Sequence, residues 1–84
     1  MTTIRVTHAE YIGEYKIRLT FSTGESGYVD FTDYLKGTMF EPLKEKTLFS
    51  DFKLNDWTIY WENGADFSPE FLHDIAVKNQ TILS

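Results

Sequence analysis

The sequence predicts a small α+β domain: an antiparallel sheet built from a three-stranded meander and a second hairpin, with short helical turns and one C-terminal helix. Residues 15–21 alternate apolar and polar side chains, as half-buried strands do. Residues 68–76 combine a helix start signal with apolar residues at helical spacing. With 84 residues the chain is long enough for one domain and too short for two, so we expect residues 1–84 to form a single domain.

The strand pattern is clearest where apolar Tyr15, Ile17, Leu19 and Phe21 alternate with polar Lys16, Arg18 and Thr20. Gly24 follows in a short segment, and its tolerance of positive φ suits a hairpin loop. Residues 28–31 then predict the returning strand. Upstream, residues 4–11 are rich in β-branched side chains and precede a turn near Gly13. Together these segments predict the three-stranded meander.

The middle of the chain predicts short elements. Residues 32–37 indicate one helical turn from Thr32 to Gly37. Residues 41–52 favour short helical or 3₁₀ pieces over one long helix, with Pro42 at a helix start and four apolar anchors, Leu43, Leu48, Phe49 and Phe52. Residues 53–62 predict the second hairpin. We expect it to turn at Asn55 and Asp56, with Ile59 and Trp61 inward and Thr58 and Tyr60 outward.

The last element is predicted to be a helix. Ser68 can cap it, Pro69 suits the first helical position, and Glu70 complements the positive end of the helix dipole. The buried face is expected to hold Leu72, Ile75 and Ala76. We expect the helix to stop at Asn79 and residues 81–84 to be a frayed end.

Composition narrows the class of protein. The formal net charge is −5, and acid dominates from Asp56 onward, so nucleic acid is disfavoured as a partner and a basic partner is favoured. The chain has no cysteine, which excludes disulfides and thiolate metal sites and fits a reducing cytoplasm. Neither a secretion signal nor an apolar run of the roughly 20 residues needed to cross a bilayer is visible. We therefore expect a cytoplasmic protein without a membrane contact.

Several motifs together resemble one known family. They are Leu19-Thr20-Phe21 with Gly24, Val29-Asp30, Leu35 with Gly37, Phe40-Glu41-Pro42-Leu43, Phe49, the run Ile59-Tyr60-Trp61-Glu62-Asn63-Gly64-Ala65-Asp66, and Pro69-Glu70 with Leu72. This order is similar to that of the small bacterial domains in the domain of unknown function 2442 family. The resemblance implies a small sheet with a short C-terminal helix and no established activity. It also implies, as for many members, a partner encoded beside the protein, as in toxin–antitoxin pairs. Glu62 departs from the family pattern, where proline is common.

The run from Trp61 to Asp66 supplies three candidate binding residues, Trp61, Asn63 and Asp66, because an indole, an amide and an acid meet at one turn. The structural alternative explains each of them separately. Trp61 would fill the core, Asn63-Gly64 would form the turn, and Asp66 would accept backbone N–H bonds before the helix.

Asp30 is the fourth candidate binding residue. It could be a buried, perturbed carboxylate on a strand, or it could face solvent or cap the turn that begins near Thr32 or Asp33. Catalysis by Asp30 would need a partner, and the sequence shows no serine elbow, Cys-His pair or phosphate-binding glycine loop. We therefore predict no catalytic residues, no cofactor and a protein that is not an enzyme.

Two functional hypotheses follow. The first is a protein-interaction module that binds another small protein, with the acidic C-terminal half providing charge complementarity. The alternative is a small-molecule or metal-binding protein that uses Asp30, Asp66, Glu70 and His73. A solvated helix face explains the last three residues better than a metal site does, because zinc would need further ligands and the only other histidine is His8. An open sheet edge also leaves room for a homodimer, through that edge or through the helix.

Overall fold

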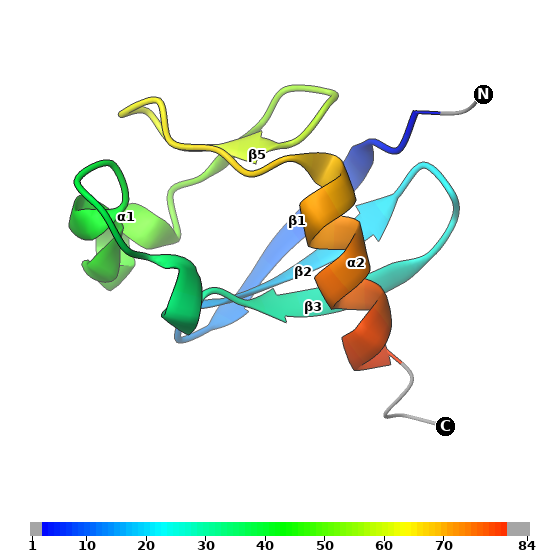
Figure 1. Cartoon of the computed structure of the whole chain (residues 1–84), viewed down its shortest axis with the longest axis horizontal. Coiled ribbons are helices and arrows are strands. Elements are labelled where there is room, and N and C mark those ends of the chain that lie inside the picture. Colours follow the sequence, from blue (N-terminus) through cyan, green and yellow to red (C-terminus); the bar gives the residue numbers. More distant parts are fainter. Residues whose placement is uncertain (1–2, 81–84) are drawn as a thin grey trace.

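The computed structural model describes residues 3–80. Its centre is a three-stranded antiparallel sheet in the order β1-β2-β3, with strands β1 (Val6–Gly13), β2 (Lys16–Phe21) and β3 (Ser26–Asp30). Helix α2 (Pro69–Gln80) crosses one face of the sheet (Figure 1). The short helices lie near the β1–β2 turn, where Lys46 pairs with Glu14, whereas the loop of the second hairpin reaches the start of β1. This arrangement confirms the predicted α+β class.

Strand β2 has the predicted alternation. Ile17, Leu19 and Phe21 are fully buried, and the residues between them are partly or largely exposed. The loop to β3 contains Gly24 at φ +92°, and the Gly24 N–H donates to the Phe21 carbonyl at 2.9 Å. Strand β3 begins at Ser26, earlier than the sequence pattern predicts, because Ser26 already pairs with Thr20 across the hairpin.

Strand β1 is an edge strand with an irregular ladder. Its pairing with β2 shifts register between Val6 and His8 and again between Tyr11 and Gly13. At its start the Val6 N–H donates to the Trp57 carbonyl at 3.0 Å, which attaches the second hairpin to the sheet. The two register shifts therefore increase the twist of this edge strand near both of its ends. At its start, the Val6 N–H that would otherwise be open at the edge is paired with Trp57.

Three short helices follow the sheet, as predicted for this segment. They are the 3₁₀ helices η1 (Thr32–Tyr34) and η2 (Glu41–Lys44) and the single-turn helix α1 (Lys46–Phe49). Leu43 and Phe49 are buried anchors and Phe52 is half-buried. The prediction that Leu48 is also an anchor is wrong, because its side chain is 49% exposed. In a single helical turn the adjacent Phe49 occupies the inward direction, and Leu48 points elsewhere.

The second hairpin pairs β4 (Lys53–Leu54) with β5 (Ile59–Tyr60). Its predicted turn is confirmed, since the Asn55 Oδ1 accepts the N–H groups of Trp57 and Thr58 at 3.1 and 3.0 Å. The predicted outward direction of Thr58 is wrong. Thr58 is buried, and its hydroxyl donates to the Phe67 carbonyl at 2.6 Å, which satisfies the polar group inside the protein. Ile59 and Trp61 are buried as predicted, and Tyr60 is half-buried.

Helix α2 has the predicted start. The Phe71 N–H donates to the Ser68 Oγ at 3.2 Å, and Pro69 is the first helical residue. Leu72 and Ala76 are fully buried and Ile75 is half-buried. The predicted stop at Asn79 is wrong, because the helix includes Gln80. The predicted frayed end, residues 81–84, lies outside the described residues. Within the described part of the chain, no helix has the length and apolar character needed to traverse a bilayer.

Helix α2 lies unusually close to β3 at Gly27. A Cβ atom on Gly27 would stand 2.2 Å from the Ala76 carbonyl oxygen, so only glycine permits this approach. The helix thereby covers the core, in which aromatic rings are prominent. Phe31 contacts Phe49 at a centroid distance of 5.6 Å, and Phe49 stacks on Trp61 at 5.7 Å.

Candidate functional site

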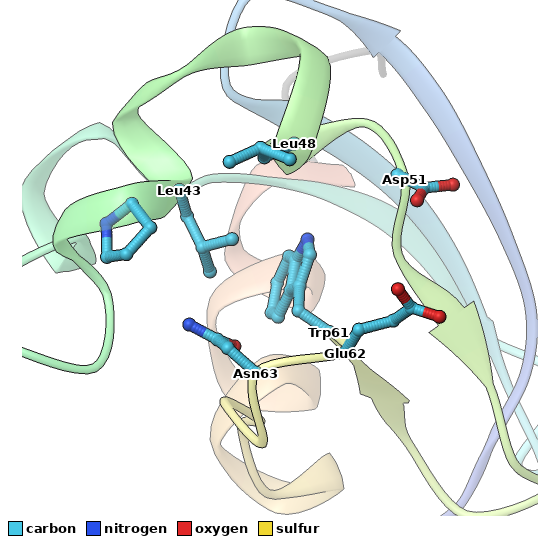
Figure 2. Close-up of a pocket in the computed structure, with 7 residues that line it drawn as sticks. Leu43, Leu48, Asp51, Trp61, Glu62 and Asn63 are labelled. Atoms are coloured by element: carbon cyan, nitrogen blue, oxygen red, sulfur yellow. The ribbon is translucent and has the colours of Figure 1, made fainter.

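A groove of about 180 Å³ opens between the short helices and the segment after β5 (Figure 2). We call it the Trp61 groove. Its lining residues are Pro42, Leu43, Leu48, Asp51, Trp61, Glu62 and Asn63. The groove contains two of the four candidate binding residues, Trp61 and Asn63, together with neighbours that the sequence did not single out as binding residues.

The floor of the groove is apolar and firmly held. Trp61 is only 2% exposed, and its Nε1–H donates to the Phe49 carbonyl at 2.8 Å. The predicted core role of Trp61 is therefore confirmed, and the indole presents very little surface to the groove. Leu48 adds exposed apolar surface above it (Figure 2).

One side of the groove is acidic. The carboxylates of Asp51 and Glu62 lie on the same side in Figure 2. The Lys53 Nζ is 4.0 Å from an oxygen of each, so a single exposed lysine is shared between two exposed acids. These exposed contacts contribute little stability in water, and one lysine against two carboxylates leaves the rim with a net charge of −1. An apolar floor beside a negative rim is complementary to an arginine or lysine side chain, which has an aliphatic stem and a cationic end.

Asn63 serves mainly to hold the turn. Its Oδ1 accepts the Ala65 N–H at 3.1 Å, and its Nδ2 donates to the Met39 carbonyl at 2.8 Å. Gly64, at φ +94°, donates its N–H to the Trp61 carbonyl. The predicted Asn63-Gly64 turn is thus confirmed. The hydrogen bond from the Asn63 Nδ2 to the Met39 carbonyl fixes the wall of the groove. Local sequence did not predict this bond, because Met39 lies far from Asn63 in the chain.

The other two candidates lie elsewhere. The Asp30 side chain is exposed, so the alternative of a buried carboxylate is wrong. Its Oδ1 accepts the Thr32 N–H at 3.0 Å and the Thr32 hydroxyl at 2.6 Å, which holds the turn as the capping alternative expects. These hydrogen bonds, chiefly that from the hydroxyl, lower the pKa of Asp30 because they stabilise the ionised carboxyl group. Asp66 is exposed, and its backbone forms an isolated bridge with Tyr60. The prediction that Asp66 accepts backbone N–H bonds before the helix is wrong: within residues 3–80 its carboxylate accepts none, and the helix start is capped by Ser68 instead. A binding role for Asp30 and Asp66 stays a prediction.

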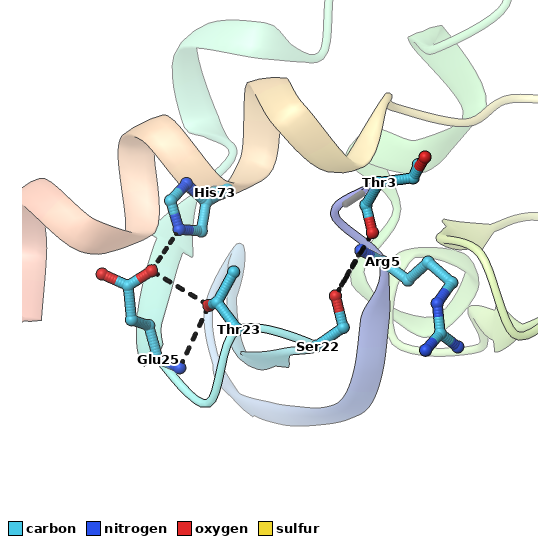
Figure 3. A network of polar contacts seen from close by, with 6 residues as sticks. All are labelled: Thr3, Arg5, Ser22, Thr23, Glu25 and His73. Carbon is cyan, nitrogen blue, oxygen red and sulfur yellow. Dashed lines mark hydrogen bonds and ion pairs between the residues drawn. The ribbon is translucent and has the colours of Figure 1, made fainter. Parts of the chain in front are cut away.

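His73 turns toward the β2–β3 loop (Figure 3). Its Nε2 lies 2.6 Å from the Glu25 Oε1, which also accepts the Thr23 hydroxyl at 2.9 Å. The hydrogen bond from His73 is the main cause that lowers the pKa of Glu25. The His73 ring also packs edge-on against Phe21, at a centroid distance of 5.0 Å. Across residues 3–80, no three His, Cys, Asp or Glu side chains form a group that could hold a metal ion.

Leu48 and Asp51 line the groove, although neither was a predicted binding residue. A signal was available for Leu48, because two adjacent apolar residues in one helical turn cannot both point into the core. Asp51 carried no such signal. It joins the groove only because the chain after α1 returns past Trp61, which is a tertiary effect.

The fold and the groove define a small α+β protein with a three-stranded antiparallel sheet, one covering helix and an acid-rimmed surface groove. The chain belongs to the family described as protein of unknown function (DUF2442), whose family model matches residues 6–77. The resemblance indicated by the sequence motifs is therefore confirmed over nearly the whole chain. Searches of curated proteins and of solved structures found no significant match.

Proposed function

We propose that this protein is a small protein-interaction module that binds another small protein through the Trp61 groove. The observation that carries the proposal is the combination of an apolar floor with the acidic rim of Asp51 and Glu62. In this proposal the groove receives one arginine or lysine side chain of the partner. Its stem lies on Leu48 and Trp61, and its charge lies at the rim.

The size of the groove favours a protein partner over a free ligand. Sites for drug-sized molecules usually have about 300–1,000 Å³. The Trp61 groove, with about 180 Å³, is smaller and suits a single inserted side chain. The rest of such an interface would be the flatter surface around it.

The charge of the whole molecule supports a basic partner. The formal net charge is −5, which attracts a basic protein over a distance of several ångströms and accelerates its association. The resemblance suggests that the partner is the product of the adjacent gene, as in toxin–antitoxin pairs. The proposal places both proteins in the bacterial cytoplasm and assigns no catalytic step to this one.

The test is binding to the neighbouring gene product, measured by isothermal titration calorimetry at physiological salt. We expect the double variant Asp51→Asn/Glu62→Gln to bind at least about tenfold more weakly, because the cationic anchor loses its counter-charge. The matched control is Glu10→Gln/Asp74→Asn, which removes the same charge outside the groove. Its affinity should change by less than about threefold, the effect of screened long-range charge.

Two results would contradict the proposal. One is equal weakening in both double variants, which would show that only net charge matters. The other is recovery of the wild-type protein alone when it is purified at physiological salt together with the neighbouring gene product.

A further inference from the structure

A second surface consists of aromatic rings. Tyr34, Phe40, Phe67 and Phe71 form a continuous series that we call the aromatic face. The ring centroids of Phe40 and Phe67 are 4.9 Å apart, those of Phe67 and Phe71 are 5.7 Å apart, and those of Phe71 and Tyr34 are 5.2 Å apart. Four rings from three separate parts of the chain therefore meet in one series.

The rings of the aromatic face extend from the core to the protein surface. Its inner member, Phe67, contacts the buried rings of Phe31 and Trp61 at 5.1 and 6.1 Å. Its outer members, Tyr34 and Phe71, are 37% and 38% exposed, and the exposed Met39 adjoins Phe40 in the chain. Phe40 and Phe67 are half-buried, so the surface open to water is formed chiefly by Tyr34 and Phe71. Large aromatic side chains that stay exposed side by side are typical of interaction surfaces, since folding alone would favour their burial.

Acidic residues flank these rings in the sequence. Asp33 precedes Tyr34, Asp66 precedes Phe67, and Glu70 precedes Phe71. All three are exposed, and none forms an ion pair with any residue in the range 3–80. Lys36, two residues after Tyr34 in the chain, brings one opposing charge. The segments that carry these rings therefore have an excess of negative charge.

We propose that the aromatic face binds a basic polypeptide segment, in which arginine or lysine side chains alternate with apolar ones. The apolar side chains would cover Phe71 and Tyr34, and the cations would pair with Asp33, Asp66 and Glu70 or lie over a ring. This inference rests on the proposed function but assigns a different surface to it. The segment belongs to the same small partner, and it binds beside the anchor in the Trp61 groove.

Charge disfavours the other occupants of such a surface. A second copy of this chain would bring like-charged carboxylates together around the rings. Nucleic acid and anionic lipid headgroups would be repelled for the same reason. A cationic peptide is the occupant that both the rings and the acids favour.

The probe is a blocked 12-residue peptide of alternating arginine and leucine, compared with the same peptide carrying glutamate in place of arginine. Binding is measured by calorimetry in 150 mM NaCl, and the contact surface by ¹H–¹⁵N chemical shifts. We expect the arginine peptide to shift the amides of Tyr34, Phe67 and Phe71 most strongly. The glutamate peptide should leave them unchanged.

Two double variants test the parts of the face separately. Tyr34→Gln/Phe71→Gln removes the exposed rings, and Asp33→Asn/Glu70→Gln removes charge while leaving the rings in place. Each should weaken arginine-peptide binding by about tenfold or more. The charge-matched control Glu10→Gln/Asp74→Asn should change it by less than about threefold. Because the charge variant alters only exposed side chains, it keeps the test valid even if the ring variant fails to fold.

Several results would overturn the inference. The largest shifts could map to the Trp61 groove, or the control could weaken binding as much as the charge variant does. Light scattering could instead show a dimer that Tyr34→Gln/Phe71→Gln converts to a monomer, which would make a second copy the occupant. A different result would contradict the proposed function, namely that the neighbouring gene product does not bind the wild-type protein. If that product binds both aromatic-face variants as tightly as it binds the wild type, only the present inference is wrong.

Discussion

Trp61 illustrates how single residues in this protein combine packing with hydrogen bonding. Its indole stacks on Phe49, contacts Phe31 at 6.2 Å, and donates a hydrogen bond to the Phe49 carbonyl. The second tryptophan, Trp57, is 44% exposed and contributes its carbonyl to the start of β1. The two tryptophans therefore provide a natural comparison between a core residue and a surface residue.

We expect Trp61→Phe to lower the free energy of unfolding by about 2–4 kcal/mol, since it leaves the Phe49 carbonyl unpaired and removes buried volume. Urea unfolding followed by circular dichroism measures this change. The control Trp57→Phe keeps the backbone hydrogen bond of residue 57 and should cost less than about 1 kcal/mol. Equal losses in the two variants would contradict the role assigned to Trp61.

Glu25 makes stability depend on acid pH. Because hydrogen bonds from His73 and Thr23 lower the pKa of Glu25 in the folded state, the stabilisation is complete above the ordinary glutamate pKa of about 4.3 and is lost as the pH falls through the lower, folded pKa. The melting temperature of the wild type should therefore fall more steeply between pH 5 and pH 3 than that of Glu25→Gln. The control Glu10→Gln, on strand β1, should follow the wild-type curve.

Individual side chains show where sequence reasoning succeeds and where it stops. The turn at Asn63 and the cap at Asp30 were predictable, because each makes hydrogen bonds with backbone only two residues away. The burial of Thr58 was not, because its partner is the Phe67 carbonyl, which comes near only after the chain has turned back. The same distinction applies to Asp51 in the Trp61 groove.

At the scale of elements, the contact between β3 and α2 is so close that it leaves no room for a side chain at residue 27. We expect Gly27→Ala to lower the free energy of unfolding by about 1–3 kcal/mol, because its Cβ would meet the backbone carbonyl of Ala76 and the helix would have to move away. Thermal unfolding measures the loss, and hydrogen exchange should show earlier opening of the α2 amides. The neighbouring substitution Ser26→Ala serves as the control and should have a much smaller effect. A Gly27→Ala variant with unchanged stability would contradict the close approach.

Elements with strong local patterns were predicted well. Strand β2 follows a period of two and α2 begins with a capping serine and a proline, so both were identified from neighbouring residues. The aromatic face was not, because its rings come from η1, from the segment before η2, and from Phe67 and Phe71 just before and within the start of α2. Phe67 and Phe71 have a helical spacing of four, but their exposure is set by what packs around them.

At the scale of the whole molecule, the net charge of −5 governs encounters with other proteins. If the partner is basic, as proposed, the association rate should fall by about tenfold or more when NaCl rises from 0.05 to 0.5 M, because salt screens the long-range attraction. Surface plasmon resonance separates this rate from dissociation, which should change less. An association rate independent of salt would contradict a basic partner.

Self-association is a separate question at this scale. The expected homodimer, through the β1 edge or the helix, stays a prediction. The two register shifts in β1 and the repulsion between like-charged copies both oppose pairing through that edge.

The position of α2 at the end of the described chain has a consequence for synthesis. Leu72 and Ala76 complete a core whose other side, including Ile17 and Phe31, is translated much earlier. About 45 residues separate Phe31 from Ala76, which takes a ribosome roughly 2–9 seconds at about 5–20 residues per second. During that interval the apolar side of the nascent sheet lacks the helix that covers it in the folded protein, and this exposed surface favours aggregation until α2 is added.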